Sequence, residues 1–354
     1  MSRFFSDKYM DLVPYTPGEQ PRDQQYIKLN TNENPYPPLP EVAEAVAAES
    51  GRQNLYSDPE CTELRKTLAE RLRVGEDELL MTNGSDEVLN FAFMAFCDRH
   101  VPAVFPDITY GFYPVFAAIN LVPYEEIPVK EDLSIDIRDY FQRAGTIFLA
   151  NPNAPTALAL SRSEIEEILK HNLYNVVVVD EAYVDFGSES CVPLIRKYDN
   201  LLITQTFSKS RSMAGARLGM GIGNPDLIRD LNTVKYSINP YNVNRLTAAA
   251  AVACLKRDEY NRKNCETIMQ TRSHCERELR ALGFEMTTSR TNFFFARHPG
   301  IPGETLYREL KNRGILVRHF SQERIRDYNR ITVGTPEQME KLTEAIRQIL
   351  EERT

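Results

Sequence analysis

The middle of the chain alternates short apolar runs with segments of helical periodicity. The clearest run is "VVVV" at 176–179, directly before Asp180. Because every position in it is apolar, a strand formed there must be covered on both faces. The other runs read as strands are "VPAVF" (101–105), "TIFLA" (146–150), "LLITQ" (201–205) and "LGMGIG" (218–223). Strands separated by helices predict an α/β fold with a mainly parallel sheet.

Helix signals lie between these runs. The segment "SRSEIEEILKHN" opens with a capping box from Ser161 to Glu164, and "NPDLIRDLNTVKY" has Pro225 in its first turn. The alternation extends over about 30–240, which we expect to form one large domain.

The pattern changes after Pro240. One long helical stretch is expected from Arg245 to Leu282, with Gly283 as its C-terminal cap. The segments that follow are "NFFFAR", "GETLYRELKNRG", "ILVRHF", "NRITVGT" and a final helix that begins "PEQMEKL". Together they predict a small α+β domain over 241–354, joined by an N-terminal arm over 1–29.

Composition narrows the class of protein. The chain has 354 residues, 42% hydrophobic and 26% charged, as expected for a soluble globular protein of about two domains. A net charge of −8 argues against a general nucleic-acid or anionic-membrane binder. No apolar run approaches the ~18 residues of a membrane span, and the N-terminus lacks signal-peptide features, so a cytoplasmic location is expected.

The six cysteines lie at 61, 97, 191, 254, 265 and 275 and include no CxxC pair. A zinc site needs tighter pairs with histidines at matching spacing, so no metal site is expected. Reduced thiols are the simpler interpretation.

Polar residues follow the predicted strands, at the sheet edge where ligands of open α/β folds bind. After "LLM" comes "TNGSDE", in which Gly84 and Ser85 open a helix whose free N–H groups suit a phosphate. "TIFLA" is followed by "NPNAPT". The later strands are followed by Asp180 and Tyr183, and by Thr206, Ser208, Lys209 and Arg217.

These residue types match the demands of pyridoxal 5'-phosphate. Lys209 offers an amine for the aldehyde as a Schiff base, Asp180 a countercharge for the ring nitrogen, and Tyr183 a donor to the phenolic oxygen. Donors for the phosphate are Ser85, Thr206, Ser208 and Arg217, and Tyr110 can stack on the ring.

Each signal alone has an ordinary explanation. A lysine after a strand is usually solvated, an aspartate there commonly caps the next element, and Gly-Ser before a helix is a common turn. Five complementary groups at successive strand ends are not expected by coincidence.

The residues resemble those of the fold-type I aminotransferases, which use pyridoxal phosphate, over nearly the whole chain. The resemblance implies a large α/β domain with a mainly parallel sheet and a smaller α+β domain. The motifs that carry it are "LNTNENPYPP" (29–38), "LYSDPE" (55–60), "TNGSDE" (82–87), "ANPNAPT" (150–156), "VVVDEAYVDF" (177–186), "TFSKSRSMAGARLG" (206–219), "INPYNVN" (238–244), "ILVRHF" (315–320) and "RITVGT" (330–335).

The motifs "NENPY" and "PYNVN" and the segment around Lys209 resemble the corresponding sequences of one branch of that family. Its members transfer the amino group of L-histidinol phosphate to 2-oxoglutarate by a ping-pong reaction in histidine biosynthesis, giving glutamate. The alternatives are an aromatic amino-acid aminotransferase, an amino-acid-phosphate decarboxylase of the same superfamily and, much less favoured, a non-catalytic cofactor-binding module.

The resemblance also implies a role for each matching residue. Lys209 holds the cofactor and shuttles the proton, and Asp180 and Tyr183 complete the catalytic set. Tyr56 reaches the cofactor phosphate of the partner subunit, which implies a homodimer with shared sites. The remaining cofactor-binding residues are Gly84, Ser85, Asp86, Tyr110, Asn153, Thr206, Ser208 and Arg217.

Substrate binding is implied for Arg330, Arg318, Tyr15 and Asn32. Arg330 lies where the family binds the carboxylate of glutamate. The phosphate of histidinol phosphate must enter the same pocket, which is chemically reasonable because guanidinium groups bind both anions. His319 is expected to be structural.

The chain departs from the family in one turn. The common turn reads Asn-Asn-Pro-Thr-Gly, but here Ala154 replaces the second Asn and Ala157 the Gly. The donor to the phenolic oxygen that is lost at Ala154 must be replaced, with Asn151 or Asn153 as candidates. The alanine at 157 leaves the shape of the turn open.

Overall fold

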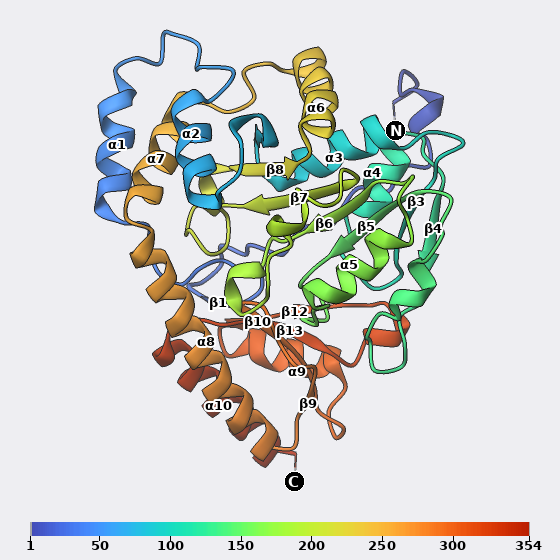
Figure 1. Cartoon of the computed structure of the whole chain (residues 1–354). Helices are drawn as coiled ribbons and strands as arrows, with labels where there is room; N and C mark the ends of the chain where they lie inside the picture. The colour runs from blue at the N-terminus through green and yellow to red at the C-terminus, as the bar shows by residue number, and fades with distance from the viewer. Residues whose placement is uncertain (1, 354) are drawn as a thin grey trace.

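The computed structural model describes residues 2–353 and centres on a seven-stranded sheet of order β2-β8-β7-β6-β5-β3-β4 (Figure 1). Within this sheet only β8 runs antiparallel to its neighbours. The predicted α/β class with a mainly parallel sheet is therefore confirmed. The strands are β2 (Leu79–Thr82), β3 (Ala103–Pro106), β4 (Tyr124–Ile127), β5 (Thr146–Ala150), β6 (Val177–Asp180), β7 (Leu201–Thr206) and β8 (Gly219–Gly223).

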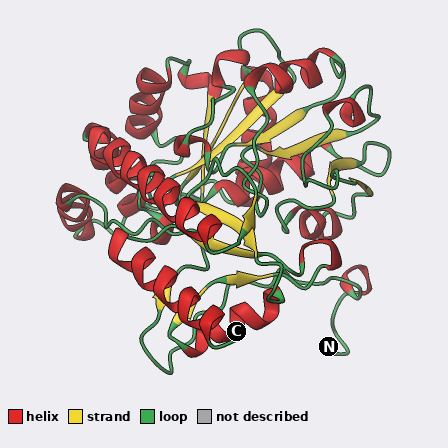
Figure 2. Cartoon of the chain, turned by 90° about the horizontal axis from the view of Figure 1, so that it is seen from below, coloured by secondary structure: helices red, strands yellow, loops and turns green. Residues whose placement is uncertain are grey.

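Helices cover both faces of this sheet, as the run "VVVV" requires (Figures 1 and 2). Val177 and Val179 belong to one apolar cluster, and Val178 belongs to another on the opposite face. The capping box from Ser161 to Glu164 is present at the start of α5. The helices that surround the sheet are α1 (Pro40–Ser50), α2 (Thr62–Leu72), α3 (Ser85–Phe96), α4 (Tyr113–Ile119), α5 (Arg162–Lys170), α6 (Pro225–Ile238) and α7 (Arg245–Lys256).

A second, four-stranded sheet of order β12-β13-β10-β9 lies below the first in Figure 1. The N-terminal segment packs with the elements around this second sheet. Its strand β1 pairs in parallel with β11, and Leu29 belongs to the apolar cluster that contains residues of β10, β11 and β13. The elements are β1 (Ile27–Lys28), α8 (Asp258–Ala281), β9 (Glu285–Met286), β10 (Phe293–Arg297), α9 (Gly303–Asn312), β11 (Ile315–Leu316), β12 (Arg318–His319), β13 (Asn329–Thr332) and α10 (Pro336–Glu351).

Short 3₁₀ helices connect several of these elements. They are η1 (Asp7–Tyr9), η2 (Glu76–Glu78), η3 (Ile137–Tyr140), η4 (Val184–Phe186), η5 (Val192–Leu194), η6 (Ala214–Ala216) and η7 (Glu323–Ile325). Among the described residues, no helix combines the length and apolar character needed to cross a bilayer.

Two helices replace the single long helix expected over 245–282. The prediction was wrong at Arg257, whose φ of −128° and ψ of 39° separate α7 from α8. The next residue, Asp258, is buried and forms an ion pair with Arg71 of α2, so a tertiary contact sets the new direction. The predicted end at Gly283 is confirmed by its positive φ of +90°.

Chain direction brings the polar strand ends to one edge of the large sheet. The strands β2, β5, β6 and β7 are mutually parallel, so their carboxyl ends meet there. Because β8 runs the other way, the residues that precede it reach the same edge. Gly219, the first residue of β8, lies opposite both Thr82 and Thr206.

Gly219→Ala is expected to destabilise the protein by about 1–3 kcal/mol, as overpacking of a close contact does. A methyl group at this position would overlap backbone atoms of Gly84 and Ser85 at the start of α3. Gly215→Ala is the control, since a methyl group there meets no atom within 4 Å. Denaturant unfolding of both variants measures the difference, and equal stabilities would contradict the close approach.

Candidate active site

A cavity of about 270 Å³ lies at this edge of the large sheet. Most of the site residues predicted from the sequence line it together. They are Tyr15, Asn32, Ser85, Asp86, Tyr110, Asp180, Tyr183, Thr206, Ser208, Lys209, Arg217, Arg318 and Arg330. Three predicted residues, Gly84, Asn153 and Tyr56, do not line it.

Lys209 places its amine inside the cavity. Its Nζ donates to the carbonyl oxygen of Thr31 at 3.3 Å and lies 5.7 Å from the centre of the Tyr183 ring. The amide of Asn34 donates to the backbone carbonyl of Lys209 at 3.0 Å. The lysine is thus held between a loop of the N-terminal segment and the residues that follow β6.

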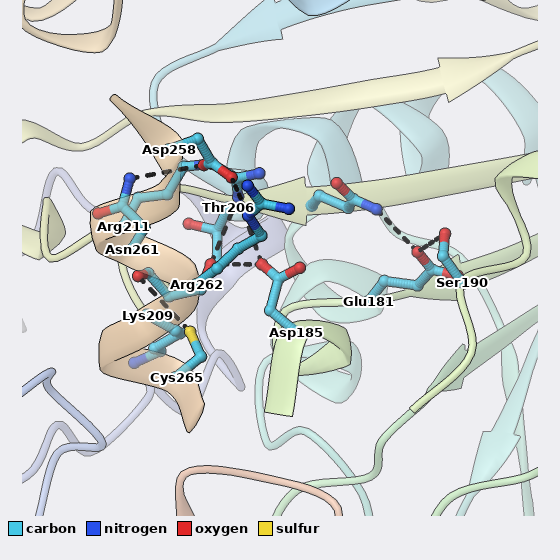
Figure 3. Close-up of polar contacts among 12 residues, drawn as sticks. Glu181, Asp185, Ser190, Thr206, Lys209, Arg211, Asp258, Asn261, Arg262 and Cys265 are labelled. Atoms are coloured by element: carbon cyan, nitrogen blue, oxygen red, sulfur yellow. Dashed lines mark hydrogen bonds and ion pairs between the residues drawn. The ribbon is translucent and has the colours of Figure 1, made fainter. Parts of the chain in front are cut away.

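The two residues after Lys209 are held by charged groups beside α8, of which Arg211 and Asp258 are buried and Asp185 is exposed (Figure 3). Ser210 donates to the carboxylate of Asp185, and Nη1 of Arg211 lies 3.4 Å from the same oxygen. Arg211 also lies 3.8 Å from Asp258. These contacts restrain the backbone at Lys209 from the side opposite the cavity, and sequence reasoning did not find them.

Asp180 is 6% exposed and ends β6 at the cavity wall. It accepts a hydrogen bond from the N–H of Ala182 at 3.2 Å, but among the described residues it forms no ion pair. Burial raises the pKa of Asp180 to about 7, and the nearby carboxylate of Asp86 adds to the rise. A cation placed beside it would favour the ionised form.

The neighbouring Glu181 is also buried, but its carboxylate has several hydrogen-bond partners (Figure 3). Its carboxylate accepts hydrogen bonds from the Ser190 hydroxyl at 2.7 Å, the N–H of Cys191 at 2.5 Å and the Gln205 amide at 2.8 Å. Glu181 is therefore a satisfied structural group, and Asp180 alone faces the cavity.

The start of α3 and the segment before β8 form a second wall of the cavity. Gly84 caps α3 with a φ of +81°, and a methyl group on it would lie 2.7 Å from Nη2 of Arg217. Gly84 does not line the cavity, but its lack of a side chain therefore leaves room for the guanidinium group of Arg217. The carboxylate of Asp86 pairs with Arg217 at 3.1 Å and accepts a hydrogen bond from Tyr110 at 2.7 Å.

Hydroxyl groups complete that wall. The Thr206 hydroxyl donates to Ser208 at 2.9 Å, and both residues are buried. Helix N–H groups, hydroxyls and a guanidinium group are the donors that a phosphate dianion requires.

Arg318 and Arg330 lie on the opposite wall as cross-strand neighbours of β12 and β13. Like charges in such positions repel, yet among the described residues neither arginine forms an ion pair. Arg330 donates to the carbonyl oxygen of Asn30 at 3.1 Å, and its Nε is buried without a partner. Burial lowers the pKa of Arg330. The pair is suited to an anion that enters from the cavity.

Asn153 does not replace the donor missing at Ala154. Its amide donates to the carbonyl oxygen of Ile108, in the segment after β3, at 2.9 Å and to the hydroxyl of Thr156, in its own turn, at 2.8 Å. Asn151 is likewise bonded to the backbone of Leu160. Both amides are therefore used away from the cavity.

Asn32 instead contacts the predicted catalytic tyrosine. Its Nδ2 donates to the hydroxyl of Tyr183 at 2.9 Å, although 151 positions separate the two residues. The family resemblance implied a substrate contact for Asn32, and nothing local in the sequence indicates its contact with Tyr183.

Tyr56 lies outside the cavity and is 79% exposed. Its ring stacks on Tyr241 with 4.5 Å between the centroids. Within residues 2–353 no group of three or more His, Cys, Asp or Glu side chains is placed to hold a metal ion.

Comparison with known proteins identifies the family. The model of the aminotransferase class I and II family matches residues 24–346. The chain belongs to this family. It is 46% identical to the histidinol-phosphate aminotransferase of Brachyspira hyodysenteriae over 352 residues, or 99% of both chains.

Other relatives of this aminotransferase agree. The histidinol-phosphate aminotransferase of Clostridium acetobutylicum is 45% identical over 99% of this chain and 100% of its own. The structure of histidinol-phosphate aminotransferase from Sinorhizobium meliloti, in complex with pyridoxal-5'-phosphate, superposes with a TM-score of 0.89 at 21% identity and covers 99% of both chains. The predicted fold-type I architecture is confirmed.

Asp180→Asn is expected to stabilise the cofactor-free protein above neutral pH. The pKa of Asp180 is raised to about 7 on folding, so the stability from its protonated form is full below about pH 4 and is lost as pH rises through 7. The asparagine variant has no such loss, and its advantage should grow to at most about 4 kcal/mol. Denaturant unfolding at pH 5 and pH 8 measures this change; the same difference at both values would contradict the raised pKa.

Proposed function

We propose that this aminotransferase uses pyridoxal 5'-phosphate to transfer the amino group of L-histidinol phosphate to 2-oxoglutarate in histidine biosynthesis. The observation that carries the proposal is the cavity, which is lined by Lys209, by the buried carboxyl group of Asp180 and by two arginines that form no ion pair among the described residues. Relatives of nearly equal length, 45–46% identical, are histidinol-phosphate aminotransferases.

The residues present fit the cofactor. Asp180 supplies a buried carboxylate for the protonated ring nitrogen, and Tyr183 a hydroxyl for the phenolic oxygen. The phosphate would be held at the start of α3 by Ser85, Thr206, Ser208 and Arg217. When bound, the cofactor supplies an electron sink for the substrate carbon that bears the amine.

Lys209 provides the proton-transfer group of the reaction. With the cofactor bound, its Nζ would take the proton from the amine-bearing carbon of the substrate and carry it while the amino group is transferred. The contact with Thr31 holds that nitrogen in the cavity lining, and the contacts of Ser210 and Arg211 restrain the backbone beside it. The carboxylate of Asp180 would favour the protonated form of the ring nitrogen.

Arg330 and Arg318 orient both substrates in turn. Histidinol phosphate carries a phosphomethyl group where glutamate carries its α-carboxylate, and both are compact anions. Guanidinium groups bind either one through paired hydrogen bonds. Tyr15, whose ring stacks on Phe112 at 4.1 Å, lines the same side of the cavity and can contact the substrate phosphate or ring.

The same proposal includes a homodimer in the cytoplasm. Exposed apolar residues gather near the α1–α2 connection and the end of α6, and Tyr56 among them would reach the cofactor phosphate of a second copy. They are Leu55, Tyr56, Tyr236, Ile238 and Tyr241. The six cysteines are free, which suits a reducing compartment.

We also propose the division of the chain that the sequence indicates. Residues 30–240 would bind the cofactor, and residues 1–29 with 241–354 would form the smaller unit, of which α7 packs against α1 and α2 beside the large sheet. This unit carries Arg318 and Arg330 and therefore would bring the anion-binding wall to the cofactor.

Borohydride treatment of the cofactor-loaded protein should attach the cofactor to Lys209. Peptide mass spectrometry locates the label. Lys209→Ala should lose it while still binding the cofactor through its phosphate, whereas Lys28→Ala, which alters a lysine outside the cavity lining, should retain it. A label on another residue would refute the assignment.

Histidinol phosphate should convert the cofactor spectrum in a single half-reaction, and 2-oxoglutarate should restore it. Phenylalanine, tyrosine and threonine phosphate are the competitors. Faster conversion by an aromatic amino acid would indicate an aromatic aminotransferase, and release of carbon dioxide from threonine phosphate would indicate a decarboxylase. Failure with every amine despite bound cofactor would favour a binding module.

Arg330→Gln should lower kcat/KM by about 10²-fold for both histidinol phosphate and glutamate, since it removes one charged, paired hydrogen-bonding group. Arg326→Gln is the control, because Arg326 is exposed and does not line the cavity. Unchanged use of both substrates by the Arg330 variant would show that this arginine does not hold the anion.

A further inference from the structure

Two features of the cavity wall are unexplained by the assignments above. Ala154 stands where the family turn carries a donor to the phenolic oxygen of the cofactor. Asn32, which is 1% exposed, has a left-handed backbone with a φ of +56°. Non-glycine residues rarely adopt this conformation, and asparagine and aspartate do so most readily.

A buried chain of hydrogen bonds runs through Asn32. Its backbone N–H donates to the hydroxyl oxygen of Thr332 at 3.0 Å, and that hydroxyl donates to Asn32 Oδ1 at 3.1 Å. Asn32 Nδ2 then donates to the hydroxyl of Tyr183 at 2.9 Å. The backbone carbonyl of Asn32 accepts a further bond from Asn292 at 3.0 Å, so the loop itself is fixed.

The order of donors in this chain determines where the proton of Tyr183 points. The Thr332 oxygen already accepts the backbone N–H, so its own hydrogen is free for Oδ1, which leaves the NH₂ group of Asn32 toward Tyr183. A hydroxyl has one hydrogen, and an oxygen that accepts from an amide keeps that hydrogen for another acceptor. With the amide reversed, the Thr332 oxygen would accept from both the backbone N–H and the NH₂ group, and its own hydrogen would lose Oδ1, its hydrogen-bond acceptor among the described residues.

The acceptor on the remaining side of Tyr183 is whatever occupies the cavity, because Tyr183 lines it. We propose that Asn32 is a positioning residue that acts through Tyr183: it turns the tyrosine proton toward the phenolic oxygen of the cofactor and so replaces the donor missing at Ala154. This inference rests on the proposed function. It differs from the substrate contact that the resemblance implied for Asn32.

A hydroxyl that accepts one hydrogen bond is also polarised, and it becomes a stronger donor in the next. The Tyr183 hydroxyl, polarised in this way, can therefore compensate for the second hydrogen-bond donor to the phenolic oxygen that the chain lacks at position 154. The donated proton competes with the imine nitrogen of the lysine-bound cofactor for the phenolic oxygen, which lowers the pKa of that imine.

The test is a pH titration of the absorbance band of the lysine-bound cofactor in four proteins: wild type, Asn32→Asp, Tyr183→Phe and the double variant. Aspartate keeps the shape and tolerates the backbone conformation, but it presents an acceptor to Tyr183 and draws the proton away from the cavity. The imine pKa is expected to rise by about one unit in Asn32→Asp. In the Tyr183→Phe background the same substitution should change it little.

This double-mutant cycle separates the two ways in which an aspartate could act. A direct effect of its charge on the imine would persist without the tyrosine hydroxyl, and equal shifts in both backgrounds would overturn the inference. No shift in either background would also overturn it.

Thr332→Val tests the same chain without adding charge, and it serves should Asn32→Asp fail to fold. It releases the amide of Asn32 from its fixed orientation, so the imine pKa should rise by a smaller amount. Thr343→Val, which removes a buried hydroxyl in α10, is the matched control and should leave the titration unchanged. The same pKa in Thr332→Val as in this control would count against the inference.

The outcomes for the wild type keep the two proposals apart. Wild-type protein that takes up no cofactor would overturn the proposed function and this inference with it. Wild-type protein that holds the cofactor but does not react with histidinol phosphate would refute the substrate alone, and the titrations would still decide the role of Asn32.

Discussion

The buried carboxylate of Asp180 is the group on which the rest of the site depends. A carboxylate at the end of a doubly covered strand loses hydration, and its raised pKa records that loss. Burial also raises the pKa of Glu181, the next residue, but the Glu181 carboxylate accepts hydrogen bonds from a hydroxyl, an amide and a backbone N–H. The fold can therefore satisfy a carboxylate here, and at Asp180 it leaves the cation to a ligand.

The wall formed by Arg318 and Arg330 is positively charged and, among the described residues, has no acidic partner. Arg318 and Arg330 repel each other across two strands and belong to the smaller sheet, whereas Asp180 belongs to the larger one. The two walls therefore come from different sheets and meet only in the folded chain. The result is a cavity with fixed positive charge on one wall and, on the other, a carboxyl group that a bound cation would hold in its ionised form.

The sequence was informative where burial is two-sided and where chain direction alone decides position. The run "VVVV" predicted a covered strand, and the residues that follow each parallel strand had to meet at one edge. It was uninformative where distant contacts decide. The edge strand β4, "YEEI", has three exposed residues and no apolar pattern, the break at Arg257 depends on a contact between Asp258 and Arg71, and Asn32 meets Tyr183 only after the two sheets come together.

The hydrogen-bond donor missing at Ala154 is not replaced by a residue that is close to it in the sequence. Asn153 is the neighbour of Ala154, but its amide is bonded to the Ile108 carbonyl of another segment and to the Thr156 hydroxyl, so a donor to the cavity has to come from elsewhere in the chain.

The two alanines of that turn form one apolar cluster with Phe293, against which Tyr183 packs. Ala157 has a left-handed φ of +64°, a conformation that glycine adopts readily. Such a conformation costs about 1 kcal/mol for alanine, and the burial of its methyl group offsets part of that cost. Phe293 in turn meets the Tyr183 ring edge-on, with 5.2 Å between centroids and an angle of 86°. The apolar cluster thus fixes the plane of the tyrosine ring while Asn32 fixes its hydroxyl, so the loss of the family's asparagine and glycine is compatible with a firmly held Tyr183.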